Sequence, residues 1–119
     1  MDNKHFNEIV HGRQAKTKGI LADKGLEYSP GLDRLSNFKT AARMLHCTPE
    51  RALLGFLTKH LISIVEAINE LETHQAMGET FGYRFWDEKI GDSINYLILL
   101  EGLIIERIEA AEAAKAVEV

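Results

Sequence analysis

The sequence predicts an all-α protein, a single domain of about four helices packed as a bundle. Three observations support this fold class. A chain of 119 residues has the usual length of one domain. Its composition, 45% apolar and 27% charged, is that of a globular protein and not of a disordered one. Apolar residues recur at three- and four-residue spacing, and no alternation of period two persists long enough to indicate a sheet.

The N-terminal part of the chain has a weak helical pattern. Residues 3–24 carry apolar positions at helical spacing, interrupted by two glycines, and we expect residues 1–14 to be peripheral or frayed. Residues 24–33 contain two glycines and a proline, which indicates a loop. Asp33 can then cap a helix of about 13 residues, with Phe38 on its apolar side.

The clearest helix start lies in the middle of the chain. Thr48 is a natural N-cap, Pro49 suits the first helical position, and Glu50 complements the positive end of the helix. Apolar residues then recur at helical spacing as far as Glu72. We therefore predict a long helix with a broad apolar face toward the core.

A connection over residues 73–83 leads to a last helix, expected to begin near Trp86 or Asp87. Between residues 94 and 108 this helix is apolar on nearly every side, so it should be buried on more than one side. In a small domain this requires the centre of a bundle or an oligomer interface, and we expect a homo-oligomer. Residues 109–119 are helix-prone, and we expect them to be peripheral or frayed.

Charge and hydropathy exclude several classes of function. The net charge of −4 argues against a duplex nucleic acid partner, although unevenly placed basic residues leave room for a small anion. The one cysteine, Cys47, cannot form an internal disulfide. The apolar stretch 94–105 is too short and too polar to span a bilayer, and the first residues lack the apolar run of a secretory signal. We expect a cytoplasmic protein without a membrane partner.

The most informative polar residues are Glu88, Asp92 and Asn95. Their spacings of four and three place them on one face of the last helix, and Leu99 and Leu103 continue that face. Carboxylates on the extension of a buried stripe require a compensating cation, and oxygen ligands of this kind suit Mg²⁺. The alternative is that Glu88 and Asp92 face water and complement the positive end of their own helix.

A second polar group lies on the long middle helix. Lys59 and Ser63 are four residues apart and share a face. Lys59 could contact a phosphate or pair with Glu88 or Asp92, or it could be a solvated surface lysine. His60 falls within the apolar stripe, where a histidine is more often a satisfied core residue than a ligand.

The third candidate site is the loop before the helix that Asp33 is predicted to cap. It ends at a helix N-terminus, which favours anions. Tyr28 and Phe38 could stack on a base, and Arg34 could hold a phosphate with two hydrogen bonds. The alternative is a plain capping loop with Phe38 in the core.

The order of these motifs resembles that of small phage-type helical proteins, the nucleotide-modification-associated domain families. It is distantly similar to that of the MazG-type nucleoside triphosphate pyrophosphatases. The resemblance covers roughly residues 15–108. The motifs that carry it are Glu27-Tyr28-Ser29, Asn37-Phe38 with Ala41-Ala42, Lys59, and Glu88-x-x-x-Asp92-x-x-Asn95-Tyr96.

The resemblance implies that Glu88 and Asp92 bind Mg²⁺ and form the catalytic group with Lys59. It implies a location in the host cytoplasm if the chain is encoded by a phage. One departure is important: the MazG-type enzymes carry a Glu-x-x-Glu pair where this chain has Lys59 and Ser63. The residues expected to contact the ligand are Tyr28, Arg34, Asn37, Phe38, Ser63, Asn95 and Tyr96.

Three functions are compatible with these features. The first is nucleotide handling, with Mg²⁺-dependent hydrolysis of a nucleoside triphosphate in its active form. The second is binding or sequestration of a nucleotide, or of another small phosphorylated ligand, without chemistry. The third is a structural helical oligomer that binds no small molecule.

Overall fold

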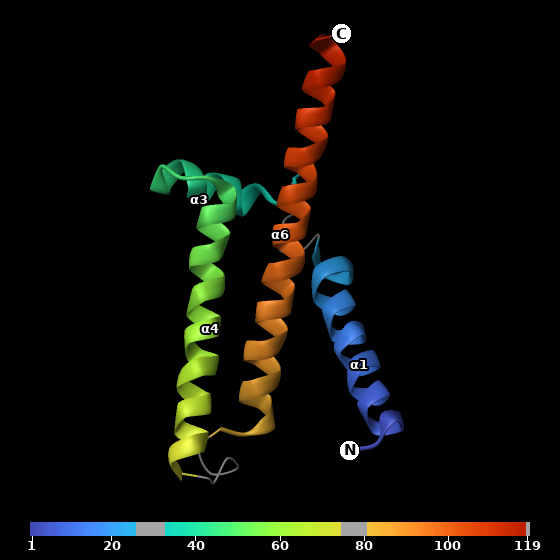
Figure 1. Cartoon of the computed structure of the whole chain (residues 1–119), viewed down its shortest axis with the longest axis vertical. Helices are drawn as coiled ribbons and strands as arrows, with labels where there is room; N and C mark the ends of the chain where they lie inside the picture. The colour runs from blue at the N-terminus through green and yellow to red at the C-terminus, as the bar shows by residue number, and fades with distance from the viewer. Residues whose placement is uncertain (26–32, 75–80, 119) are drawn as a thin grey trace.

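The computed structural model describes residues 1–25, 33–74 and 81–118, and these residues contain helices and no strand. The all-α prediction is confirmed. Figure 1 shows the arrangement: α6 lies between α4 on one side and α1 on the other, and α3 crosses one end of α4. The packing of α4 on α6 is antiparallel and is the most extensive helix contact in the molecule.

The N-terminal helix, α1 (Asn3–Lys18), begins where Asp2 accepts the backbone N–H of His5 at 2.8 Å. It continues directly into a π-helical turn, η1 (Gly19–Asp23). The residues of α1 are largely exposed, and none of them is fully buried. π-helical turns such as η1 are rare in proteins, and those that occur are often beside functional sites.

The second helix, α3 (Ser36–Leu45), is shorter than predicted and begins later. Asp33 does cap a backbone group, but it accepts the N–H of Leu35 at 2.9 Å and so closes a turn ahead of the helix. The helix ends at His46, which adopts a left-handed conformation with φ of 54°. This conformation directs the Cys47 N–H back to the carbonyl of Ala42 at 3.0 Å, and the His46 N–H donates to the same carbonyl.

The long helix, α4 (Pro49–His74), begins where the sequence predicts. The Thr48 hydroxyl accepts the N–H of Arg51 at 3.1 Å, as expected for an N-cap. The last helix, α6 (Tyr83–Glu118), begins three residues before the predicted Trp86. Two observations explain the earlier start. The Gly82 carbonyl accepts the N–H of Phe85, and the Phe81 and Phe85 rings pack at 4.5 Å across the helix start.

The core lies where α3 crosses the α4–α6 pair. Two ion-pair groups close this end of the pair. Nε and Nη2 of Arg107 donate to the two carboxylate oxygens of Glu50 at 2.8 and 2.7 Å, and Lys39 pairs with Asp33 and Glu106. Beyond this core, α6 continues to Glu118 and projects past the other elements, with residues 104–117 exposed (Figure 1). The core cluster comprises Leu35, Phe38, Leu53 and Leu103, with Tyr96, Leu99 and Leu100 packed against it.

Burial in the middle of α6 differs from the expectation. The 94–108 stretch is covered by α4 and, at the core, by Leu35 and Phe38, while Leu97, Ile98 and Ile108 are between 43% and 52% exposed. Within one chain, therefore, this stretch is not buried on every side. Among the described residues one helix, 49–73 of α4, has the length and mean hydropathy (1.3) to cross a membrane, and only 22% of that stretch is buried.

Candidate functional site

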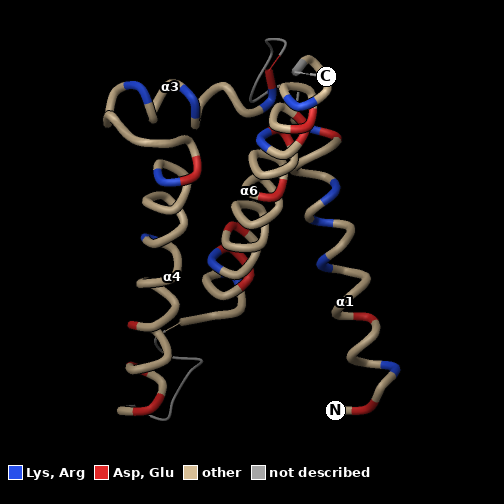
Figure 2. Tube along the Cα trace, turned by 45° about the horizontal axis from the view of Figure 1, so that its top comes forward, with Lys and Arg blue, Asp and Glu red and all other residues tan. Residues whose placement is uncertain are grey.

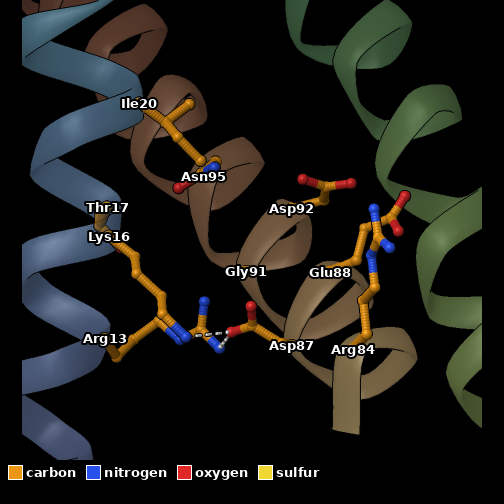
Figure 3. Close-up of a pocket in the computed structure, with 10 residues that line it drawn as sticks. All are labelled: Arg13, Lys16, Thr17, Ile20, Arg84, Asp87, Glu88, Gly91, Asp92 and Asn95. Carbon is orange, nitrogen blue, oxygen red and sulfur yellow. Dashed lines mark hydrogen bonds and ion pairs between the residues drawn. The ribbon is translucent and has the colours of Figure 1, made fainter. Parts of the chain in front are cut away.

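Two adjoining cavities form a groove along α6. The first, the α1 cavity, has a volume of about 440 Å³ and lies between α1 and α6 (Figure 3). The second, the α3 cavity, has a volume of about 400 Å³ and lies between η1, α3 and α6. Ile20, Asp92 and Asn95 line both cavities, so these three residues mark the junction. Sizes of this order are typical of small-molecule sites.

The wall formed by α1 is held against α6 by an ion-pair group. Arg13 and Lys16 donate to the same oxygen of Asp87, at 2.6 and 2.9 Å, and Lys16 also donates to the hydroxyl of Tyr83 at 3.2 Å. Figure 2 shows the basic segments of α1 beside the stretch of α6 where acidic and basic residues alternate. These contacts position α1 as the outer wall of the α1 cavity.

Gly91 makes this close approach possible. A Cβ at this buried position would lie 2.6 Å from a guanidinium nitrogen of Arg13, so any larger residue would push the arginine away. The hydrogen bonds from Lys16 and then from Arg13 hold the pKa of Asp87 below its ordinary value of 3.8. The hydrogen bond to Asp87 and then that to Tyr83 raise the pKa of Lys16.

Replacing Asp87 with asparagine is expected to loosen α1 from α6, because the charge that Arg13 and Lys16 share is lost. Acid should act in the same way. The folded-state pKa of Asp87 is lowered, so its stabilising contribution is present at neutral pH and disappears as the pH falls below about 3.8. Hydrogen exchange of residues 3–18, corrected for intrinsic rates, measures both effects. Glu8→Gln on the exposed part of α1 is the matched control, and equal protection in Asp87→Asn and the wild type would refute the role of this contact.

The floor of the groove carries the predicted acids. Figure 3 shows Asp87 and Asn95 turned toward α1, whereas Glu88 extends toward the α4 side of the helix. Glu88 is exposed, the Asp92 side chain is 37% exposed, and Asn95 is buried with 8% exposure. Because α6 begins at Tyr83, no acid lies in its first turn. The helix dipole, which acts mainly on the first turn, therefore does not account for these two carboxylates.

Two buried polar atoms near Asp92 lack a hydrogen-bond partner. They are Nδ1 of His60 and Oδ1 of Asn95. Nδ1 of His60 lies 3.8 Å from a carboxylate oxygen of Asp92, which is an ion-pair distance when the ring is protonated. A buried polar atom without a partner is costly, and such atoms are common where water, an ion or a ligand completes the site.

His60 has the expected place but not the expected hydrogen-bond partners. It lies on the core side of α4, as its position in the apolar stripe indicates, and its ring is 5.4 Å from that of Tyr96. It is not a satisfied core residue, since its Nδ1 is unpaired and faces Asp92. In the sequence, His60 stands out as a polar residue within an apolar stripe. Its partner Asp92 could be identified only from the pairing of α4 with α6.

Lys59 and Ser63 are not brought into the groove. Lys59 is exposed, and the Ser63 hydroxyl donates to the Lys59 carbonyl of its own helix at 3.1 Å. Among the described residues that line the two cavities, neither is present. The predicted pairing of Lys59 with Glu88 or Asp92 has no counterpart in the described contacts.

The α3 cavity has an aromatic side. Tyr96 stacks on Phe56, with ring centroids 6.4 Å apart and planes 7° apart, and Phe38 meets Tyr96 edge-on at 6.3 Å. Phe38 is a core residue with 8% exposure, which agrees with the alternative of a plain capping loop. Burial and then the negative charge of Asp92 raise the pKa of Tyr96, so its phenol remains a neutral hydrogen-bond donor.

Two polar residues complete this cavity. Asn37 lies exposed at its edge, and Arg34 lines it from the segment ahead of α3. The Arg34 side chain packs over Gly25, where a Cβ would lie 2.9 Å from its Nε. Tyr28, the remaining residue predicted to contact a ligand, lies outside the residues that the structure describes.

The predicted metal pair has a limited donor set. Within residues 1–25, 33–74 and 81–118, no three His, Cys, Asp or Glu side chains come together in a way that could hold a metal ion. Glu88 and Asp92 remain as a pair one helical turn apart at the α1 cavity. Two carboxylates do fit Mg²⁺ in a site where water and substrate phosphates supply the other ligands.

Sequence reasoning missed the α1 wall. The α1 cavity is lined by Arg13 and Lys16 of α1 and by Arg84 and Asp87 of α6. The N-terminal stretch nevertheless has no periodicity strong enough to indicate that it packs on α6.

Comparison with protein-family models, with curated proteins and with solved structures finds no match for this chain. The likeness to MazG-type and phage-type proteins therefore stays a prediction.

Proposed function

We propose that this protein binds a nucleotide along the groove, with Asp92 and Asn95 at the point where phosphates and nucleoside meet. The observation that supports this most is the two-part character of the groove. One part is lined by ionic side chains and the other by aromatic and apolar ones, and the same two polar residues join them. A nucleotide has the same two-part chemistry, with an anionic end and a flat, partly apolar end.

Charge balance in the α1 cavity supports a role for Mg²⁺. Its three cationic side chains, those of Arg13, Lys16 and Arg84, are matched by three carboxylates, those of Asp87, Glu88 and Asp92. A polyphosphate would therefore meet no net positive charge from the protein. A divalent cation held by Glu88 and Asp92 would supply two positive charges between the acids and the phosphates.

The α3 cavity suits the nucleoside. The neutral phenol of Tyr96 and the amide of Asn37 offer hydrogen bonds to a base or sugar, and Arg34 offers a planar cationic surface. The apolar walls formed by Ile20, Leu21 and Leu99 exclude water from one side of such a ligand. The nucleotide panel described next identifies the base and the sugar that bind best.

The proposal predicts binding that depends on the metal. A thermal-shift panel of the four NTPs and four dNTPs, each with Mg²⁺, Mn²⁺ or EDTA, tests it. A ligand at 100 times its Kd stabilises the folded state by about 2.7 kcal/mol. We expect a rise in Tm for at least one nucleotide with metal, and a much smaller rise with EDTA. If no nucleotide shifts the Tm under any condition, the proposal is wrong.

Hydrolysis is the second candidate, and the His60–Asp92 contact is the observation that favours it. His60 lines neither cavity, so the group that would accept the proton of a water attacking a phosphoanhydride is the Asp92 carboxylate at the junction. His60 would position that carboxylate from 3.8 Å, and the cleaved phosphate would leave as an anion. Chromatography of the same nucleotide mixtures after incubation separates the two functions. Product formation that is lost in His60→Gln indicates an enzyme, whereas binding without product indicates a sequestering protein.

A further inference from the structure

A second surface lies on the opposite side of the α4–α6 pair from the groove. On α6, Ile90, Leu97 and Ile104 follow one another at intervals of seven residues and are between 41% and 52% exposed. On α4, an equivalent series has the same interval and is between 42% and 44% exposed: Leu54, Leu61 and Ile68. Seven-residue apolar repeats are the signature of helices that pack against other helices at a shallow angle.

The two series lie on the same side of the helix pair. Each exposed residue directly follows, in sequence, a residue that faces the other helix: Leu61 follows His60, and Leu97 follows Tyr96. One residue is a rotation of about 100°. Because α4 and α6 run antiparallel, a step of one residue toward the C-terminus turns the side chain to the same side of the pair on both helices. Asn95, which precedes Tyr96, is rotated the other way, toward the groove.

The series also lie at the same level along the pair. Leu53 and Leu103 belong to one core cluster, so their successors Leu54 and Ile104 are at one height. His60 and Tyr96 are in ring contact, which places Leu61 beside Leu97 in the same way. We call this continuous surface the outer face. Its members are Leu54, Leu61, Val65 and Ile68 of α4 with Ile90, Ile94, Leu97, Ile104 and Ile108 of α6.

The dimensions of the chain show how much surface is left uncovered. Its accessible area is 8976 Å², whereas a compact monomer of 13.4 kDa exposes about 6,500 Å². Its radius of gyration is 18.1 Å, against about 13.5 Å for a compact domain of this length. The excess of about 2,500 Å² exceeds the roughly 800 Å² that each partner buries in a standard interface. Part of this excess is the exposed surface of α1 and of the projecting end of α6, and the rest includes the outer face.

We propose that the outer face is the interface with a second copy of this chain, so that two α4–α6 pairs pack face to face as a four-helix bundle. The face is self-complementary, because both of its helices carry the same seven-residue repeat, and a two-fold axis then closes the assembly. Figure 1 shows α1 on the side of α6 away from α4, and α3 across one end of the α4–α6 pair. The groove of each copy stays accessible on the far side.

Two polar residues lie within the outer face: Thr58 of α4, whose hydroxyl donates to the Leu54 carbonyl of its own helix, and Glu101 of α6. Glu101 stands in the α6 series at the position between Leu97 and Ile104 and is exposed in the single chain. A single polar residue in an apolar seam lowers the stability of a helical assembly but selects its register. Glu101→Leu is therefore expected to tighten the association.

A bilayer is the competing occupant, since among the helices that the structure describes α4 has the length and hydropathy of a membrane span. The other faces of α4 argue against it. Lys59 and Glu66 are exposed, and His60 faces the groove acid Asp92. Charged groups on a helix within a bilayer are expensive, whereas a helix with one apolar face fits a protein partner.

The test is the molar mass of the full chain in solution, measured by sedimentation velocity over a concentration series. The wild type is expected at twice 13.4 kDa. Leu61→Glu and Leu97→Glu should each raise the dimer dissociation constant at least about tenfold, since each places a charge in an apolar interface. Met44→Glu, at an apolar side chain of α3 that is 76% exposed, is the matched control and should remain dimeric.

Circular dichroism distinguishes loss of the dimer from loss of the fold, and Glu101→Leu provides a second variant that acts in the opposite direction. A wild type that stays at 13.4 kDa at its highest soluble concentration would overturn the proposal. So would a chain that floats with phosphatidylcholine vesicles while its mass in solution stays that of one copy. Equal dissociation constants for Leu97→Glu and Met44→Glu would also be contrary to it.

Discussion

Asp92→Ala is expected to weaken the binding of a Mg²⁺-nucleotide by about 10- to 100-fold. Asp92 lies at the junction of both cavities, and its carboxylate is within 3.8 Å of the unpaired His60 nitrogen. Losing a charged partner of this kind typically costs about 1.5–3 kcal/mol, which is one to two powers of ten in affinity. The nucleotide with the largest thermal shift is the probe, and its Kd is measured by titration calorimetry.

Two further variants separate charge from shape. Asp92→Asn keeps the size of the side chain and removes its charge, so it should lose most of the Mg²⁺-dependent affinity if the carboxylate holds the metal. Glu109→Gln removes one carboxylate from the exposed tail of the same helix and should leave the Kd unchanged. An Asp92→Ala protein that binds as tightly as the wild type would show that the ligand does not occupy this junction.

The second large effect is on folding. Leu53→Ala is expected to lower the free energy of unfolding by about 3 kcal/mol, because a fully buried leucine leaves both a transfer loss and a cavity. Leu53 is 0% exposed and belongs to the cluster that joins α3, α4 and α6. Urea unfolding followed by circular dichroism measures the loss, at one fixed protein concentration so that association does not contribute.

Met44→Ala is the control for this effect. Met44 is also an apolar side chain that loses most of its atoms on truncation, but it is 76% exposed and should cost less than about 0.5 kcal/mol. If Leu53→Ala unfolds at the same urea concentration as Met44→Ala, the core does not lie where α3 crosses the α4–α6 pair.

The local features of the molecule follow from the sequence. Thr48 and Pro49 predict the first residue of α4, and the structure places the helix start there. The spacing of Glu88, Asp92 and Asn95 predicts a shared helix face, and all three do line one cavity. Such features need only contacts between residues a few positions apart, which propensity, capping and helical periodicity describe.

Features that depend on distant segments do not follow in this way. The weak periodicity of α1 gives no indication that Arg13 and Lys16 reach Asp87, more than 70 residues later. His60 and Asp92 lie on different helices, and their pairing depends on the register of α4 against α6. The exposed place of Lys59 has the same reason, since its position relative to the groove is set by the rotation of α4 and not by its own sequence neighbours.

The sequence by itself therefore determined the helical class, the start of α4 and the acids that share a face of α6. Only the tertiary structure decided which helices lie beside those acids and which apolar stripe has no cover within the chain. The physical reason is that hydrogen bonds and capping act over one helical turn, whereas helix pairing selects one rotation and one register among many that bury similar apolar area.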